Sequence, residues 1–264
     1  MSTNARDLKC KEEDLKNKVK FFNSSIFAVQ ETHYKRKGKF KLKDYAIFES
    51  IRKNKEHGGS MLGLHVGLNP VLVEEYNTEF ELLVVEIEIS NTRLRVITGY
   101  GPQENWEDSE RMPFYRALEK EIASSELEGK SVIIAMDANA KLGPDLIPND
   151  PKTMSRNGKV LAAVMERHAL SVVNGMKDKC TGVITREMST TRGIERSVID
   201  FVIISNNLKE HIEYMNIDDK RVHVLTKNTK TNATCVNIKS DHNIIETIMN
   251  LRWAPNEKSD SLQV

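Results

Sequence analysis

Three polar residues follow apolar segments, where a folded chain could direct them at a substrate. Glu31 in Gln30-Glu31-Thr32 offers the carboxylate that a hard divalent cation prefers, although strands often end in charge without binding an ion. Asp137 and Asn139 follow a second segment, and residues two apart in an extended chain project to one side. An acid that activates water and an amide that binds a phosphate oxygen would then face one substrate, and an Asx turn is the alternative.

Two further polar groups lie far apart in the sequence and suit each other chemically. Asp200 stands in the apolar segment 198–205, where a carboxylate is costly unless it has a partner. His242 in Ser240-Asp241-His242 is a candidate partner, because a buried carboxylate makes an imidazole a stable cation or a better base; a surface histidine is the alternative. Asp241 would point elsewhere and could reach a metal ion.

Other candidate contacts are a tyrosine and a basic run. Tyr100 precedes Gly101-Pro102, which favours a tight turn, and its phenol could donate to a phosphate oxygen; an ordinary turn tyrosine is an equally good interpretation. The basic run could contact nucleic-acid phosphates or form a solvated surface. Its members are Lys35, Arg36, Lys37, Lys39, Lys41 and Lys43.

The elements that must position these residues follow from the apolar pattern. Helical periodicity predicts helices at 11–22, 107–127 and about 158–168. Short β-rich segments predict strands at 26–30, 45–50, 61–67, 82–89, 94–100, 131–137, 171–174, 198–205 and near 244–252. So many strands separated by helices predict an α/β fold, a four-layered sandwich of two packed mixed β-sheets flanked by helices.

Composition narrows the class of protein. The 264 residues suit one domain, which we place at residues 1–253, followed by a polar and flexible tail at 254–264. No apolar run approaches the roughly 18 residues of a membrane span, so we expect a soluble protein without a membrane partner. Lys and Arg (39) nearly balance Asp and Glu (38), so any affinity for nucleic acid must come from a local patch. Cys10, Cys180 and Cys235 form neither a CxxC pair nor a disulfide framework, which favours a reducing, intracellular compartment.

In their order along the chain, the motifs resemble those of the DNase I-like endonuclease/exonuclease/phosphatase superfamily over residues 1–253. Met136-Asp137-Ala138-Asn139 is similar to its "GDFN" motif, with Met136 and Ala138 departing at packing positions. Gln30-Glu31-Thr32 resembles its "QE(T)" motif, Ser197 to Phe201 its "S-x-IDY" strand, and Ser240-Asp241-His242 its closing "SDH".

Within that superfamily the chain resembles the AP-endonuclease-like endonuclease domains of non-LTR retroelement polyproteins. Asn4-Ala5-Arg6-Asp7-Leu8 is similar to their "NARSL" start, and Asn157-Gly158 and Cys180 to Arg186 match later segments. The phosphatase branch usually has a histidine where this chain has Tyr100. Only three residues precede Asn4, so we expect the first strand to be truncated.

The resemblance implies a set of roles. Mg²⁺ or Mn²⁺ would be held by Glu31, Asp241 and Asn4. The resemblance gives catalysis to Asp137, Asn139, Tyr100, His242 and Asp200, and it points to Asn157 for substrate binding. Arg186 and Arg192, which precede Ser197, and Arg6 are further candidate contacts with the substrate. The partner would be DNA, nicked to leave a 3′-hydroxyl and a 5′-phosphate. A retroelement origin further implies a larger polyprotein with reverse transcriptase and a nuclear location.

Two other functions fit the sequence. The neutral net charge also suits a phosphatase or phosphodiesterase acting on small-molecule or lipid phosphates. A catalytically decayed domain that binds nucleic acid or protein is the third interpretation, because the first strand is so short.

Overall fold

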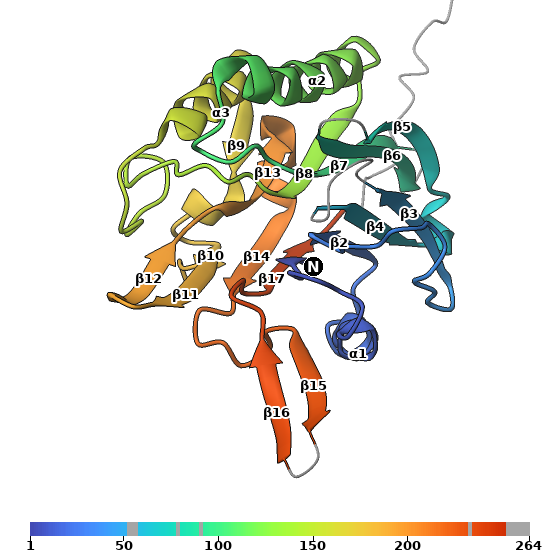
Figure 1. The fold of residues 1–264 in the computed structure, drawn as a ribbon. Helices are drawn as coiled ribbons and strands as arrows, with labels where there is room; N and C mark the ends of the chain where they lie inside the picture. Colours follow the sequence, from blue (N-terminus) through green and yellow to red (C-terminus); the bar gives the residue numbers. More distant parts are fainter. Residues whose placement is uncertain (52–57, 78–79, 90–91, 232–233, 252–264) are drawn as a thin grey trace, which may run out of the picture.

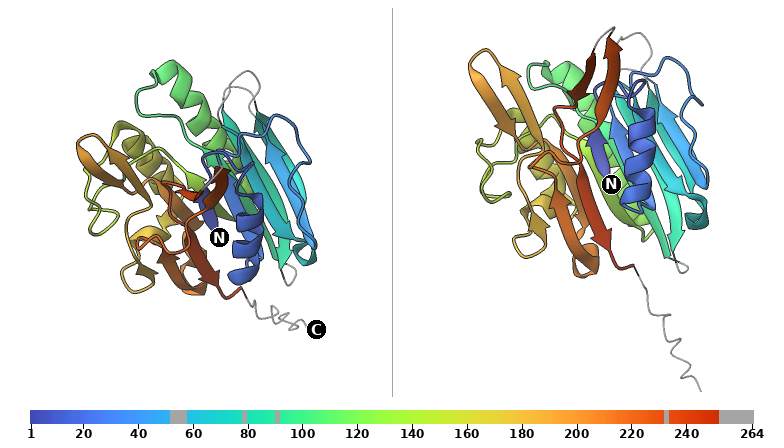
Figure 2. Two further views of the ribbon diagram at one scale, coloured as in Figure 1. Left: turned by 60° about the horizontal axis from the view of Figure 1, so that its bottom comes forward. Right: turned by 90° about the horizontal axis from the view of Figure 1, so that it is seen from below.

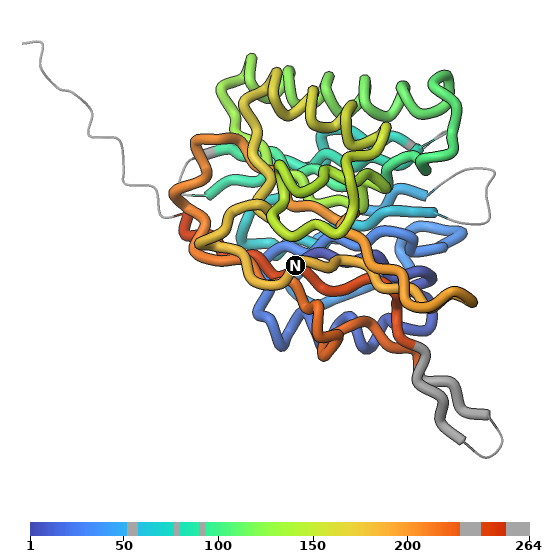
Figure 3. The backbone as a smooth tube through the Cα atoms, turned by 90° about the vertical axis from the view of Figure 1, so that its left-hand side faces the viewer, coloured from blue at the N-terminus to red at the C-terminus, as the bar shows by residue number. Residues whose placement is uncertain are grey.

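Two β-sheets pack face to face in the computed structural model, with helices on both outer faces (Figure 1). The structure describes residues 1–51, 58–77, 80–89, 92–231 and 234–251. Helix α1 (Glu12–Phe21) covers the outer face of one sheet, and α2 (Asp108–Leu127) and α3 (Arg156–Arg167) cover the other. Figure 3 shows this layering edge-on. The four-layered α/β sandwich predicted from the sequence is therefore confirmed.

The seven-stranded sheet has the strand order β10-β14-β17-β1-β2-β4-β3. Its strands are Ser2–Asn4 (β1), Ile26–Gln30 (β2), Tyr45–Ser50 (β3), Ser60–His65 (β4), Cys180–Thr181 (β10), Ile212–Ile217 (β14) and Ile245–Met249 (β17). β1 lies parallel to β2 and antiparallel to β17, so Asn4 lies beside Gln30 and Ser2 beside Ile245. β1 is thus a three-residue strand with a backbone partner on each side.

The six-stranded sheet has the order β5-β6-β7-β8-β13-β9. Its strands are Val71–Asn77 (β5), Glu81–Ile89 (β6), Thr92–Tyr100 (β7), Ser131–Asp137 (β8), Leu170–Val172 (β9) and Asp200–Ser205 (β13). β7 and β8 are parallel and are joined through α2, whereas β13 runs antiparallel to β8. The C-terminal ends of β7 and β8 therefore lie next to the N-terminal end of β13, at one end of the strands.

Two hairpins and three short 3₁₀ helices complete the fold. The hairpins are Arg186–Thr190 (β11) with Gly193–Ser197 (β12), and Thr226–Thr231 (β15) with Thr234–Lys239 (β16). Figure 2 shows the β11–β12 hairpin projecting from the body of the sandwich. The 3₁₀ helices are Val66–Leu68, Val173–Gly175 and Asn206–His211.

The core lies in three apolar clusters, one between the sheets and one under each helical layer. Leu64 and Val85 belong to the cluster between the sheets, Leu15 of α1 packs on the seven-stranded sheet, and Phe114 of α2 packs on the six-stranded one. Burying such side chains contributes about 1.5 to 3 kcal/mol each. This packing fixes the strand ends, where the candidate site residues lie.

All predicted helices and strands are present, with boundaries shifted by a few residues. The segment predicted as strand 61–67 turns into a 3₁₀ helix at Val66, and the segment predicted at 198–205 becomes regular only at Asp200. The sequence missed β5, β10, β14 and both hairpins, because their strands are too short or lack the clean alternation of a half-buried strand. In the described part of the chain, no helix has the length and apolarity to cross a membrane. The predicted tail, 254–264, lies outside the described residues.

Candidate active site

Strand pairing brings Tyr100, Asp137 and Asp200 together. Parallel β7 and β8 pair Tyr100 with Asp137, and antiparallel β8 and β13 pair Asp137 with Asp200. Directly paired side chains share a face of the sheet. That face looks toward the seven-stranded sheet, because Ala135 and Val202, each two residues away, pack in the core between the sheets.

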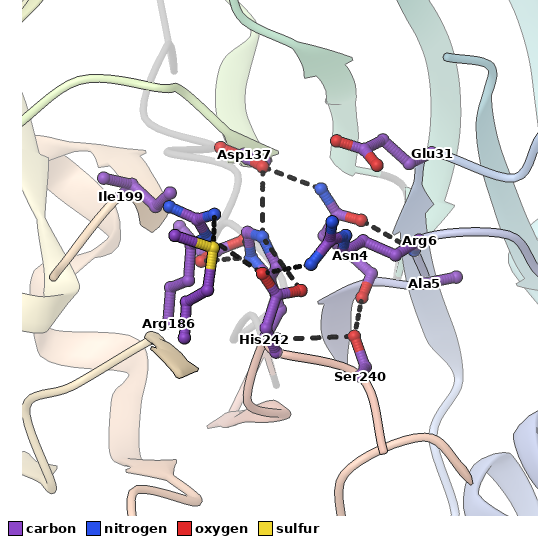
Figure 4. A network of polar contacts seen from close by, with 12 residues as sticks. Asn4, Ala5, Arg6, Glu31, Asp137, Arg186, Ile199, Ser240 and His242 are labelled. Atoms are coloured by element: carbon purple, nitrogen blue, oxygen red, sulfur yellow. Dashed lines mark hydrogen bonds and ion pairs between the residues drawn. The ribbon is translucent and has the colours of Figure 1, made fainter. Parts of the chain in front are cut away.

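His242 points toward Asp137 (Figure 4) and also contacts Asp200. Its Nδ1 atom is 3.0 Å from both carboxylate oxygens of Asp200, and its Nε2 atom is 3.9 Å from Oδ2 of Asp137. Burial by itself lowers the pKa of His242, but the carboxylates of Asp200, Asp137 and Asp241 outweigh it and raise the pKa to about 9. The imidazole is therefore a cation at neutral pH in the metal-free protein.

Asp137 is held by β1 and by its own turn. Nδ2 of Asn4 donates to Oδ2 of Asp137 at 2.8 Å, and the N–H of Asn139 donates to Oδ1 at 2.9 Å. The second bond is an Asx turn, so the turn that we weighed against a catalytic role is what orients the acid. Burial and the Asp200 carboxylate raise the pKa of Asp137 to about 7. A carboxylate with a pKa near neutrality is suited to take a proton from water.

Glu31 enters the site from the end of β2 with a left-handed backbone, φ +50°. Burial by itself raises the pKa of this carboxyl, but hydrogen bonds from His33, Tyr100 and Asn4 lower it to about 2. The Nε2 atom of His33 lies 3.7 Å from Oε2 of Glu31. Glu31 is therefore ionised at neutral pH and has the charge that a cation requires.

Tyr100 links Glu31 to Asn139. Burial and the negative charges of Asp137 and Glu31 raise the pKa of Tyr100, so its phenol keeps the proton that it donates to Glu31. Asn139 in turn hydrogen-bonds the phenol and donates from Nδ2 to the carbonyl oxygen of Gly101 at 3.0 Å. The Asn139 amide thus positions Tyr100 in this structure.

Two arginines converge on Asp241. Nη1 of Arg6 lies 2.8 Å and Nε of Arg186 lies 3.1 Å from the same oxygen, Oδ2 of Asp241. The side chains of Arg6 and Arg186 are 51% and 29% exposed, so both keep donors available to a ligand. The other oxygen of Asp241, Oδ1, is buried without a hydrogen-bond partner and lies 3.9 Å from Nε2 of His242.

Glu31, Asn4 and Asp241 supply oxygen ligands that fit a hard divalent ion. Glu31 is ionised, and the buried Oδ1 atom of Asp241 is left unpaired, as a ligand atom would be before an ion binds. Oδ1 of Asn4 accepts the N–H of Arg6 at 2.9 Å and retains a second lone pair. The oxygen donors of these three residues are therefore of the kind that Mg²⁺ or Mn²⁺ binds.

Asp137, Asp200 and His242 form a second possible set, with donor atoms all within 4.8 Å of one another. A ligand histidine must be neutral, whereas His242 is cationic and already bound to Asp200. The oxygen set around Glu31 is therefore the better candidate for Mg²⁺ or Mn²⁺.

The predicted substrate contacts Asn157 and Arg192 differ in burial, because Asn157 is buried and Arg192 is exposed. Asn157 is fully buried beneath the site, where its Nδ2 donates to the carbonyl oxygens of Pro102 (2.7 Å) and Asn139 (3.1 Å). Its amide ties two loops together, and a contact between Asn157 and the substrate stays a prediction. Arg192 lies near the exposed tip of the β11–β12 hairpin, whereas Arg186 lies at its base.

Buried polar residues around Asp200 escaped the sequence analysis. Oγ1 of Thr185 accepts the N–H groups of Ile199 (2.9 Å) and Asp200 (3.1 Å), and Thr185 is fully buried. Asn174 donates to the carbonyl oxygen of Asp200 at 3.1 Å and accepts the N–H of Val202 at 3.1 Å. Nothing in the sequence distinguishes such residues from surface threonines and asparagines.

Arg221 was missed as well. Its Nη1 atom donates to the carbonyl oxygen of Asp241 at 3.1 Å and to Oδ1 of Asn243 at 2.9 Å, while Nη2 donates to the carbonyl oxygen of Ser240. The guanidinium therefore fixes the backbone of the segment that carries Asp241 and His242.

Comparisons with known proteins were made for the whole chain. No protein-family model and no curated protein sequence matches it. Among solved structures, the endonuclease domain of TRAS1, a telomere-specific non-LTR retrotransposon, has a TM-score of 0.66 and 16% identity over 96% of this chain and 99% of that chain. The AP endonuclease LMAP from Leishmania major has a TM-score of 0.72 and 12% identity, covering 94% of this chain and 87% of that chain. The Xenopus laevis APE2 catalytic domain has a TM-score of 0.69 and 15% identity, covering 94% and 91%.

The chain has the fold of the DNase I-like endonuclease/exonuclease/phosphatase superfamily, as its motifs predict. The likeness to the TRAS1 domain spans nearly the whole of both chains, so the resemblance to non-LTR endonucleases is confirmed at the level of the fold. At these identities the comparisons establish the fold alone, and the chemistry has to be argued from the site.

Proposed function

We propose that this protein is a divalent-metal-dependent endonuclease that hydrolyses phosphodiester bonds in DNA, leaving a 3′-hydroxyl and a 5′-phosphate. The observation that carries the proposal is the chain of contacts from Asn4 through Asp137 and His242 to Asp200. It places a near-neutral acid beside a fixed imidazolium, with an ionised carboxylate at Glu31 nearby.

Asp137 is the residue proposed to activate water. Asn4 and the Asn139 N–H fix both oxygens of the carboxylate, so its orientation is set before substrate arrives. With a pKa of about 7, Asp137 is partly ionised at neutral pH and can accept the proton of the attacking water.

Stabilisation of developing negative charge is assigned to His242 and Tyr100. The imidazolium directs Nε2 to the space bounded by Asp137 and Asp241, and the protonated phenol of Tyr100 is a neutral donor. Asn139 acts with Tyr100 by holding the phenol. Donors fixed in place cost no reorganisation when the phosphate gains charge.

A divalent ion held by Glu31, Asp241 and Asn4 would polarise the phosphoryl oxygen and neutralise its charge. Mg²⁺ and Mn²⁺ suit these oxygen donors. Arg6 and Arg186 would hold DNA phosphates beside this ion, because both are partly exposed and already grouped at Asp241. Arg192 would add a contact from the hairpin tip.

A retroelement origin is the further part of the proposal, with a nuclear location and a reverse transcriptase in the same polyprotein. It is supported by the motif resemblance and by the likeness to the TRAS1 endonuclease domain. The reading frame around the gene tests this directly, and a downstream reverse transcriptase is the expected result.

Incubation with supercoiled plasmid tests the activity. We expect Mg²⁺ or Mn²⁺ to support conversion to the open-circular form and EDTA to stop it. Ligation of the nicks by DNA ligase would verify the 3′-hydroxyl and 5′-phosphate ends. Release of phosphate from small phosphate esters without any nicking would refute the endonuclease and favour a phosphatase, the activity named for a mannosyl-6-phosphatase of similar fold.

A further inference from the structure

The connection between β2 and β3 carries the six basic residues of the run 35–43. β2 and β3 are both antiparallel to β4, so they run in the same direction. The connection must therefore return from the site end of the sheet to the opposite end. The basic run therefore extends from the site end of the sheet toward its opposite end.

The connection is anchored to the protein by its apolar and backbone groups. Phe40 is 1% exposed, and its ring centroid lies 6.0 Å from that of Phe27 on the outer face of the sheet. The N–H of Gly38 donates to the buried carboxylate of Glu49. With its interior side fixed in this way, the connection presents its charged side chains to solvent.

The first part of the run lies at the site end. Lys35 and Arg36 come four and five residues after Glu31. Glu49, which holds Gly38, precedes Ser50, and Ser50 is linked through Ser60 of β4 to Gln30 at the end of β2. Both basic side chains are exposed.

The last part of the run lies at the opposite end. The N–H of Tyr45 donates to the carbonyl oxygen of Leu42 at 3.3 Å, and the Tyr45 hydroxyl donates to the carbonyl oxygen of Ser24, which precedes β2. Lys41 and Lys43 flank Leu42 and are exposed. They are thus separated from the site by the length of the sheet.

Most of the charge of the run has no ion-pair partner among the described residues. Within the described residues, Lys37 alone among the six makes an ion pair, with Glu75. Exposed basic residues without acidic partners attract polyanions, even in a chain whose net charge is only +1.

We propose that Lys35 and Arg36 form a binding surface for the phosphate backbone of duplex DNA flanking the cleaved bond, and that Lys41 and Lys43 do not contact it. This inference rests on the proposed function, because the position of the site decides which end of the run meets DNA. Arg6 and Arg186 lie on the segments that converge on Asp241, so the duplex would be held by basic residues from separate parts of the chain.

Two double variants of the same connection test the proposal. K35Q/R36Q and K41Q/K43Q each remove two exposed positive charges from the same loop, at its two ends. Binding of a labelled 30-base-pair duplex is measured by fluorescence anisotropy in EDTA over a range of salt concentrations. The logarithm of the affinity falls with the logarithm of the salt concentration, and each lost phosphate contact makes this negative slope shallower by about 0.9. We therefore expect the magnitude of the slope to fall by about 2 for K35Q/R36Q. K41Q/K43Q should show no resolvable change in slope, and both variants should keep their melting temperatures.

The outcomes separate this inference from the proposed function. An unchanged slope in K35Q/R36Q, or equal falls in both variants, would overturn the inference while plasmid nicking by the unaltered protein still stood. Absence of nicking together with a fall confined to K35Q/R36Q would reject the endonuclease and support the DNA surface. Loss of binding to phosphatidylserine vesicles by K35Q/R36Q, without a change in its DNA slope, would show that the surface serves acidic lipid and overturn the proposal.

Discussion

The Nδ1 atom of His242 lies 3.0 Å from both carboxylate oxygens of Asp200, and the two residues are 3% and 1% exposed. Together they place a buried positive charge next to Asp137, whose carboxyl has a pKa of about 7. A charge that is buried and paired is costly to separate.

Asp200→Asn should lower the pKa of His242 well below its value of about 9, because burial opposes the charged form and its main opposing carboxylate is lost. NMR titration of the imidazole in metal-free protein measures this. Asp178→Asn, at an exposed acid, is the matched control and should leave the titration unchanged. A His242 pKa that stays near 9 in Asp200→Asn would contradict the assignment.

Asp137 should make the metal-free protein less stable as pH rises. Its pKa of about 7 in the folded protein lies above the ordinary value of 3.8, so folding favours the protonated form. Stability associated with that proton is complete below about pH 3.8 and is lost as pH rises through 7. Asp137→Asn should therefore lose less stability between pH 5 and pH 8, as measured by urea denaturation in EDTA. Parallel losses in the variant and the unaltered protein would refute this.

Asp137→Ala should reduce single-turnover nicking by about 10² to 10⁴, the usual contribution of a general base. His242→Ala should reduce it by about 10² to 10³, the usual contribution of one donor that stabilises developing charge. Binding of duplex DNA should persist, because the DNA phosphates are proposed to be held by Arg6 and Arg186, which both variants retain. His65→Ala, at an exposed histidine on β4, is the control and should nick normally. Full activity in either site variant would show that the assigned role is wrong.

Glu31→Gln should weaken binding of Mn²⁺ in the absence of DNA, because it removes one of the two carboxylates of the proposed ligand set. Electron paramagnetic resonance of free Mn²⁺ measures the affinity without relying on activity. Glu88→Gln, at an exposed position of β6, should bind Mn²⁺ like the unaltered protein. Equal affinities for all three proteins would move the ion to other residues.

Thr185→Val should destabilise the fold by about 2 to 6 kcal/mol, because it leaves two buried N–H groups unsatisfied, each costing about 1 to 3 kcal/mol. Thr185→Ser keeps the hydroxyl and should retain most of the stability. Urea unfolding compares them. If Thr185→Ser loses more stability than Thr185→Val, the methyl group rather than the hydroxyl is what matters.

The sequence by itself determined the class of fold and which residues end its strands. Apolar segments stop at Glu31, Tyr100 and Asp137, because a buried strand tolerates charge only where it leaves the core. The alternation of side chains also fixes their face once the strand is assigned. These features are local, so periodicity and turn residues suffice to predict them.

Only the tertiary structure decided how these strand ends meet. The Ser240 hydroxyl donates to the carbonyl oxygen of Asn4 across 236 positions, and Asn4 reaches Asp137 across 133. No local pattern specifies such pairings, since they depend on sheet order and on packing between sheets. The same reason explains why Asn157 is buried, why Thr185 supports Asp200, and why one continuous basic run is divided between two ends of the molecule. The sequence thus predicted the candidate site residues one by one, whereas strand order and packing brought them together.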